Sequence, residues 1–272
     1  MTSFEAAVLG LVQGITEFLP ISSTAHLRIV PALLGWADPG AAFTAVLQLG
    51  TLAAVIGYFL RELLAMIGAA LAAAGDPARR DDPNARHLLY LVVGTIPVGI
   101  AGILLKHAIE GSFRSLWVVA TSMIVIALVL GYVEKSARHE RGYDSIRLRD
   151  AVIIGCAQVL ALVPGVSRSG ITLLAAMALG LRRDAAARFS FLLSVPAVAA
   201  AGIFELPKVL KAHDIGGAPL FIGLLVAFVS GYASIAWLLR FLRTRTTMPF
   251  VVYRVLLGIV ILALLFSGRV AA

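Results

Sequence analysis

The stretch EFLPISSTAH, residues 17 to 26, decides the fold. It places a carboxylate, three hydroxyls and an imidazole around a helix-breaking proline, in a chain that is 60% hydrophobic and only 14% charged. Soluble domains carry about 25% charged residues, so this composition indicates an integral membrane protein. The polar stretch is therefore either a loop in water or a site within the membrane.

Four charge-free runs indicate membrane-spanning helices. They cover residues 43–60, 88–105, 115–133 and 215–239, and each is close to the roughly 20 residues that cross about 30 Å of hydrocarbon. The sequence lacks the alternating ten-residue segments of an outer-membrane barrel. The N-terminus has no basic region and carries Glu5, which is not typical of a cleaved signal peptide. We expect an all-α polytopic membrane protein.

The sequence contains an internal repeat. GLVQGITEFLPISSTAHLRIVPALLG (10–35) resembles GCAQVLALVPGVSRSGITLLAAMALG (155–180): each has a glutamine, a proline, a serine cluster and a closing glycine. A second pair of segments aligns at a constant offset of 146, which pairs Phe43 with Phe189. A single membrane domain (1–272) is therefore predicted, with one repeat in 1–135 and another in 148–272.

The first element of each repeat is too short to cross a bilayer. Residues 6–16, before the first proline, would extend only about 16 Å as a helix. Such a half-helix can enter the bilayer, turn near its middle and leave on the side it entered; irregular backbone is tolerated there only inside protein or facing a wet cavity. Each repeat is then a re-entrant helical hairpin plus three transmembrane helices. Because three is odd, the two repeats have inverted topology.

The basic residues predict the orientation. Of 23 Lys and Arg, 15 fall on the side opposite the N-terminus and six on the N-terminal side, with Arg168 and Arg254 assigned to the membrane. By the positive-inside rule both termini lie outside, and the net charge of +8 reflects cytoplasmic loops rather than nucleic-acid binding. The hairpins then enter from opposite faces and meet near the midplane. Arg28 and Arg254, near span ends, are interpreted as snorkelling residues.

The two hairpin tips hold the residues that can do chemistry, since ionisable groups within a membrane are costly and functional by default. Arg168, in a glycine-flanked turn, offers a bidentate fork to phosphate beside a helix N-terminus. Glu17 suits a hard cation such as Mg²⁺, which prefers a carboxylate plus phosphate oxygens. His26 can move protons near neutral pH, and Ser23, three residues earlier, shares its helix face, so a serine–base pair is one option.

Each of these residues also has a structural interpretation. The serines can be N-caps, and His26 can be a satisfied interfacial histidine. Glu17 and Arg168 can form a structural ion pair, while Gln13 and Gln158 can join helices by hydrogen bonds. It is less plausible that all of these structural interpretations hold together at two matched broken helices than that the residues form a functional site.

The motifs at the two hairpin tips resemble those of a known family. QGITEFLPISSTAHL (13–27) resembles the first motif of the bacterial undecaprenyl-pyrophosphate phosphatases, the bacitracin-resistance family, and PGVSRSGIT (164–172) resembles the second. The agreement covers nearly the whole chain. It implies an inner-membrane enzyme that removes the terminal phosphate of undecaprenyl pyrophosphate with a divalent metal, Mg²⁺ or Ca²⁺, and so regenerates the lipid carrier for peptidoglycan. It also implies two inverted repeats with re-entrant helices.

The motif matches carry functional positions onto both tips. Residues 17, 22, 23 and 26 match the first motif and residues 167, 168 and 172 the second. Gln13 stands where many members have a second glutamate, which puts metal binding through two carboxylates in doubt. The resulting prediction assigns catalysis to Glu17, Ser23, His26 and Arg168, metal binding to Glu17, and substrate binding to Gln13, Ser22, Thr24, Ser167, Ser169 and Thr172.

Several alternatives stay open. Either Ser23 attacks phosphorus with His26 as base, or His26 activates water. Broken helices that meet at the midplane are also the pattern of transporters, so a lipid-phosphate transporter is the rival class; an ion channel is disfavoured because no ring of like charges is visible. The expected partners are a polyprenyl diphosphate and membrane lipids, with a site opening to the outer face. The sequence does not distinguish a monomer from a dimer.

Overall fold

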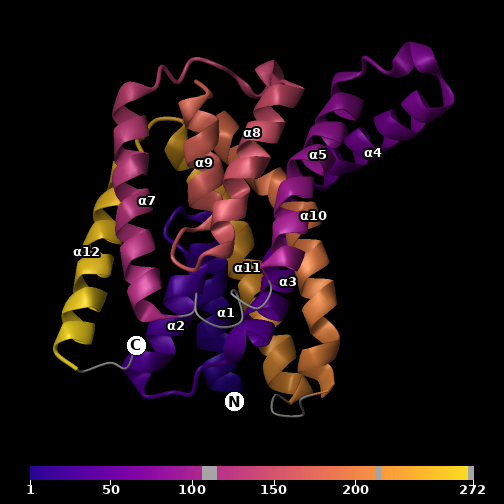
Figure 1. Cartoon of the computed structure of the whole chain (residues 1–272). Coiled ribbons are helices and arrows are strands. Elements are labelled where there is room, and N and C mark those ends of the chain that lie inside the picture. The colour runs from indigo at the N-terminus through magenta and orange to yellow at the C-terminus, as the bar shows by residue number, and fades with distance from the viewer. Residues whose placement is uncertain (106–114, 212–215, 269–272) are drawn as a thin grey trace.

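The computed structural model describes residues 1–105, 115–211 and 216–268, and their secondary structure is helical apart from one isolated β-bridge between Arg141 and Leu181 (Figure 1). Short 3-10 turns join some of the helices. The α-helices are α1 (Ser3–Phe18), α2 (Ser23–Leu34), α3 (Gly40–Tyr58), α4 (Leu60–Gly75), α5 (Pro83–Leu104), α7 (Leu116–Ser136), α8 (Leu148–Gln158), α9 (Arg168–Ala178), α10 (Arg183–Lys211), α11 (Gly217–Leu242) and α12 (Met248–Phe266).

Within the described residues, five helices are long and apolar enough to cross a membrane: α5, α7, α11, α12 and the Arg183–Ile203 part of α10. The pair α3 and α4 passes the same test but bends by 76°, and makes a sixth span if counted as one. The predicted multi-pass helical fold is therefore confirmed. One difference is α4, a 16-residue helix that follows the first charge-free run and that none of the four runs predicts.

The two predicted hairpins break as expected, and their breaks share an unusual backbone geometry. Helix α1 ends at Phe18 and α2 starts at Ser23, while α8 ends at Gln158 and α9 starts at Arg168. The residue before each second helix is a serine with positive φ, 73° at Ser22 and 72° at Ser167. Non-glycine residues rarely adopt this region. Each serine then caps the helix it precedes, as its hydroxyl accepts a hydrogen bond from a backbone N–H three residues on.

Close helix crossings hold both first half-helices in the bundle. Helix α1 packs on α11 and α8 packs on α5. A Cβ on Gly10 would lie 2.4 Å from the carbonyl oxygen of Gly223, and one on Gly155 would lie 2.2 Å from that of Gly94. Only glycine permits backbones this close, which is a common device between membrane helices. The remaining large contacts include α3 with α10 and α7 with α12.

The two hairpins occupy opposite ends of the bundle in Figure 1. Helices α1 and α2 lie in its lower half, where α1 begins and α12 ends, and α8 and α9 lie in its upper half beside the projecting α4. Ion pairs join elements towards the upper end, including Arg188 with Glu62 at 2.8 Å and Arg141 with Asp150 at 2.5 Å. The breaks of both hairpins therefore lie towards the middle of the molecule.

Candidate active site

Glu17 is the centre of a buried polar cluster. It lies one residue before the end of α1, and its side chain is only 5% exposed. Its Oε2 accepts hydrogen bonds from Ser23 Oγ at 2.6 Å and from Gln13 Nε2 at 2.8 Å. Its Oε1 accepts from Arg168 Nη2, also at 2.8 Å. One carboxylate therefore joins both helices of the first hairpin to the second hairpin.

Arg168 reaches this carboxylate from the first position of α9. Its side chain is 15% exposed, so the ion pair with Glu17 is largely shielded from solvent. The second terminal nitrogen, Nη1, is buried and has no hydrogen-bond partner within the described part of the chain. A buried charged donor without a partner is costly, so this edge of the guanidinium is a natural place for an anion.

His26 has a hydrogen bond at each ring nitrogen. Its Nδ1 lies 2.7 Å from the carbonyl oxygen of Ser22, and its Nε2 lies 2.6 Å from the hydroxyl of Tyr253 on α12. Because a carbonyl oxygen only accepts, the proton of the neutral ring is assigned to Nδ1, and Nε2 accepts from the tyrosine. The two rings are also stacked, with centroids 5.7 Å apart and an interplanar angle of 6°.

The pairing of Ser23 with His26, one of the options that the sequence left open, does not form in this structure. The hydroxyl of Ser23 donates its single proton in a hydrogen bond to Glu17, and Nε2 of the imidazole is hydrogen-bonded to Tyr253. The physical reason is that Glu17, at the end of the preceding half-helix, brings a carboxylate within hydrogen-bonding distance of Ser23. Thr24, the next residue of α2, is partly buried.

The predicted serines of the second tip are structural neighbours of the cluster. Ser169 donates to the carbonyl oxygen of Leu19 at 3.0 Å and so ties the second tip to the first. Its hydroxyl also lies 3.2 Å from that of Ser167. Thr172 is fully buried, and its hydroxyl contacts Ser190 on α10 at 2.6 Å. Thr172 therefore joins α9 to α10 and has no contact with Glu17 among the hydrogen bonds of the described residues.

Gln13 and Gln158 occupy matching positions but differ in their partners. Besides its bond to Glu17, Gln13 Nε2 lies 3.4 Å from the hydroxyl of Thr51 on α3, so it also joins helices. Its amide oxygen is buried without a partner in the described structure, as are both amide atoms of Gln158. An unpaired amide oxygen beside a carboxylate is free to bind a donor or a cation.

Arg254 is the main correction to the sequence interpretation, and the prediction that it snorkels is wrong. The side chain is fully buried on α12. Its Nη1 donates to the carbonyl of Pro20 in the first tip at 3.1 Å, and both terminal nitrogens donate to that of Val166 in the second at 3.0 Å. Nη2 and Nε donate to the carbonyls of Gly165 and Met123. A signal was present in VVYRVLLG, where the arginine has apolar neighbours on both sides.

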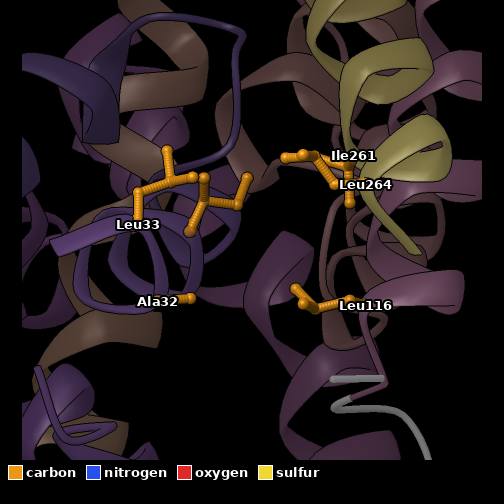
Figure 2. A pocket seen from close by; sticks show the side chains of 6 residues that line it. Ala32, Leu33, Leu116, Ile261 and Leu264 are labelled. Atoms are coloured by element: carbon orange, nitrogen blue, oxygen red, sulfur yellow. The ribbon is translucent and has the colours of Figure 1, made fainter. Parts of the chain in front are cut away.

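An apolar pocket lies between α2, α7 and α12. Figure 2 shows Ala32 and Leu33 facing Leu116, Ile261 and Leu264 across the gap, and Ile29 completes the lining. Two of its walls belong to the helices that carry His26 and Tyr253. Leu33 is seven residues beyond His26, or about 10 Å along the helix. The His26–Tyr253 contact and this pocket both lie between α2 and α12, and we call this line of contact the α2–α12 seam. The pocket lies on the part of the seam that runs away from the polar cluster.

The donor set decides which metal could fit. In the described parts of the chain, no three His, Cys, Asp or Glu residues gather into a metal site. Near the ion pair a cation would find the carboxylate of Glu17 and the unpaired amide oxygen of Gln13. That set suits Mg²⁺, which keeps few protein ligands and takes phosphate oxygens and water for the rest.

Comparison with known proteins identifies relatives along the whole chain. Residues 6–260 match the family model described as "Bacitracin resistance protein BacA". An undecaprenyl-diphosphatase of Myxococcus xanthus is 55% identical over 272 residues, which cover 100% of this chain and 92% of that protein. An undecaprenyl-diphosphatase of a Nocardioides species is 49% identical, with 98% of both chains covered. That of Chloroherpeton thalassium is 48% identical and matches over the full length of both.

Proposed function

The chain belongs to the bacitracin resistance protein BacA family, and from this we infer that it is an integral-membrane undecaprenyl-diphosphatase. It hydrolyses undecaprenyl diphosphate to undecaprenyl phosphate and inorganic phosphate. The reaction returns the lipid carrier to peptidoglycan synthesis, and the family description adds resistance to bacitracin. One observation carries the assignment: a membrane-embedded arginine, Arg168, is held by Glu17 and has a free terminal nitrogen.

The free edge of Arg168 is the proposed diphosphate clamp. A guanidinium binds phosphate oxygens through two parallel N–H bonds when its fork is available. Here Nη2 is already committed to Glu17, so Nη1 makes the first contact and Nη2 shares its remaining proton. The ion pair thus orients the guanidinium before the substrate arrives, which lowers the entropy cost of binding.

Ser23 is the proposed nucleophile, with Glu17 as the acceptor of its proton. A hydroxyl hydrogen-bonded to a base that a third group orients is the arrangement of an activated nucleophile; here Arg168 orients the carboxylate. The Ser23 oxygen forms a bond to the terminal phosphorus, and the bond from that phosphorus to the bridging oxygen breaks. Undecaprenyl phosphate leaves. Water then attacks the phosphoserine, and its proton passes to Nε2 of His26 as the Tyr253 hydroxyl turns from donor to acceptor. The bond from phosphorus to the Ser23 oxygen breaks, Glu17 returns the proton to that oxygen, and inorganic phosphate is released.

A divalent cation, Mg²⁺ or Ca²⁺, is proposed as cofactor. Glu17 and the amide oxygen of Gln13 would hold it together with phosphate oxygens of the substrate. When bound, it supplies charge neutralisation on the diphosphate. Glu17 has about four lone-pair sites and uses three of them in the hydrogen bonds described above, which leaves one for the cation.

The apolar pocket of Figure 2 has a volume of only about 10 Å³, and we propose that its side chains contact the prenyl chain as it passes into the lipid. Its six side chains are all aliphatic, and they lie on the helices that carry His26 and Tyr253. A prenyl chain in this seam would bring the diphosphate end towards His26 while the tail extends into lipid.

We also propose two inverted repeats in the bacterial inner membrane, with both termini outside and the site open to the outer face. Three features support the repeats. Ser22 and Ser167 both have positive φ angles, and glycines form matching close helix crossings. In addition, the first half-helix of each repeat packs on a long helix of the other repeat, α1 on α11 and α8 on α5. The excess of basic residues at the opposite end supports the orientation. The first hairpin, which carries Glu17, Ser23 and His26, then enters from outside.

Phosphate release from undecaprenyl diphosphate by purified protein in detergent tests the function. The enzyme is expected to release phosphate without vesicles or a gradient. A lipid-phosphate transporter built on the same broken helices would release none, and absence of phosphate from well-folded protein would overturn the proposal.

A further inference from the structure

Helix α12 belongs to neither motif, yet two consecutive side chains on it reach the catalytic tips. Tyr253 contacts His26 in the first tip, and Arg254 contacts the backbone of both tips. Successive residues on a helix point about 100° apart, so the two side chains can serve different targets from one turn. Helix α12 is packed mainly against α7, which belongs to neither hairpin.

Tyr253 controls the nitrogen that a general base would use. With Nδ1 bound to a backbone carbonyl, only Nε2 of His26 has a lone pair to take a proton, and the tyrosine hydroxyl occupies it at 2.6 Å. A hydroxyl can donate to neutral imidazole and accept from imidazolium by rotating its proton. The contact can therefore persist when His26 gains a proton, while the stacked rings keep the imidazole plane fixed.

Arg254 controls the separation of the tips. Its guanidinium lies between the carbonyl of Pro20, three residues after Glu17, and the carbonyl of Val166, two residues before Arg168. The Glu17–Arg168 ion pair and the hydrogen bond from Ser169 to Leu19 also join the tips. The tips carry no regular backbone hydrogen bonds to each other in the described structure, so the planar fork of Arg254 takes that role.

We propose that Tyr253 and Arg254 are positioning residues for this reaction: the Tyr253 hydroxyl fixes the imidazole of His26 in its working orientation, and Arg254 sets the distance between the two tips. The proposal rests on the phosphatase function above. It assigns to α12 a part in catalysis that neither motif contains.

Tyr253→Phe isolates the hydroxyl, because the ring that stacks on His26 remains. We expect kcat to fall about tenfold, the usual effect of losing one neutral hydrogen bond, with KM within about twofold because the clamp at Arg168 is untouched. Tyr232→Phe on α11 is the matched control, since that tyrosine is similarly exposed, 43% against 42%, and is expected to leave both constants unchanged. In a His26→Gln background, Tyr253→Phe should cause no further loss. An unchanged kcat, or the same fall in both backgrounds, would overturn the role of Tyr253.

A measurement without substrate separates this inference from the proposed function. In protein labelled with ¹⁵N-histidine, the His26 signals, assigned by their loss in His26→Gln, should show a protonated Nδ1 and an accepting Nε2. Tyr253→Phe should shift the Nε2 signal, and an unshifted signal would refute the contact. This result holds whether or not the wild-type protein releases phosphate, whereas a wild-type protein without phosphatase activity would remove the proposed function alone.

Arg254→Lys tests the second half of the proposal. Lysine keeps the buried charge but has one nitrogen with three protons, whereas the three guanidinium nitrogens make five hydrogen bonds to four carbonyls, so we expect kcat to fall about a hundredfold in protein that still elutes as a folded species. Wild-type kcat in this variant would refute the role. If the variant does not fold, Gly170→Ala replaces it: the new Cβ would lie 3.0 Å from Arg254 Nη1, which crowds the guanidinium without removing it, and 3.1 Å from the Cβ of Ser167. Folded Gly170→Ala protein with wild-type kcat would then refute it equally.

Discussion

Removing Arg168 should disable catalysis without preventing folding. Through its free Nη1 and the remaining proton of Nη2, the side chain is proposed to supply two charge-assisted bonds to the diphosphate. Charge-assisted hydrogen bonds contribute about 1.5 to 3 kcal/mol each. Losing two of them in the transition state amounts to about 3 to 6 kcal/mol, or about 10²- to 10⁴-fold in kcat/KM. Arg168→Ala is therefore expected to lie within that range below the wild type.

Two further variants separate the charge of Arg168 from its fork, and the loss of stability from the loss of activity. Arg168→Lys keeps the charge but loses the fork, so it should recover activity to within about 10- to 100-fold of the wild type. Arg168→Ala also leaves Glu17 buried without its cation, which costs stability; adding Glu17→Gln should raise the melting temperature again without restoring activity. Arg182→Ala, at an exposed arginine paired with Asp184, is the control and should behave like the wild type.

The assay is phosphate release in detergent, with melting temperature and gel filtration recorded for every variant. A folded Arg168→Ala protein with wild-type kcat/KM would refute the clamp. So would an Arg168→Lys variant as inactive as the alanine variant, because charge would then contribute nothing.

Three other predictions follow from the same geometry. Chelators should abolish phosphate release, and Glu17→Gln should weaken the binding of Mg²⁺ measured without turnover; full activity in a chelator would assign the carboxylate to Ser23 alone. Gly10→Ala should lower the melting temperature, because the new Cβ would lie 2.4 Å from a carbonyl oxygen of α11, whereas Gly68→Ala, with nothing within 4 Å, should leave it unchanged or raise it; equal effects would contradict the proposed close crossing. With Cys156, the one cysteine of the sequence, replaced, an impermeant thiol reagent added to intact cells should label Ala37→Cys and not Asp81→Cys. The reverse pattern would show that the topology is the opposite of the one proposed.

Hydropathy and proline positions predicted most of the fold. The charge-free runs 88–105, 115–133 and 215–239 correspond closely to α5, α7 and α11, since a helix that crosses hydrocarbon must be apolar over nearly its whole length. The breaks followed from Pro20 and Pro164. Helix α4 was missed because charged residues at its start, followed by a polar segment after its end, resemble a loop.

The candidate site was predicted in part. The sequence motifs supplied Glu17, Ser23 and Arg168, which the structure brings into one cluster. Tyr253 could not be found this way, because it is 227 residues from His26 and a tyrosine in a membrane helix usually indicates an interface. Arg254 was misassigned for a similar reason: hydropathy cannot distinguish an arginine that snorkels from one that binds buried carbonyls.

The central claim is that both tips form one site that hydrolyses a lipid diphosphate. The most direct test is to quantify both products, undecaprenyl phosphate and inorganic phosphate, from purified protein in detergent, for the wild type, Ser23→Ala in the first tip and Arg168→Ala in the second. The account predicts one phosphate for each undecaprenyl phosphate in the wild type, and at least a hundredfold less of both in each folded variant. Equal product formation by either variant, or substrate left intact by the wild type, would contradict it.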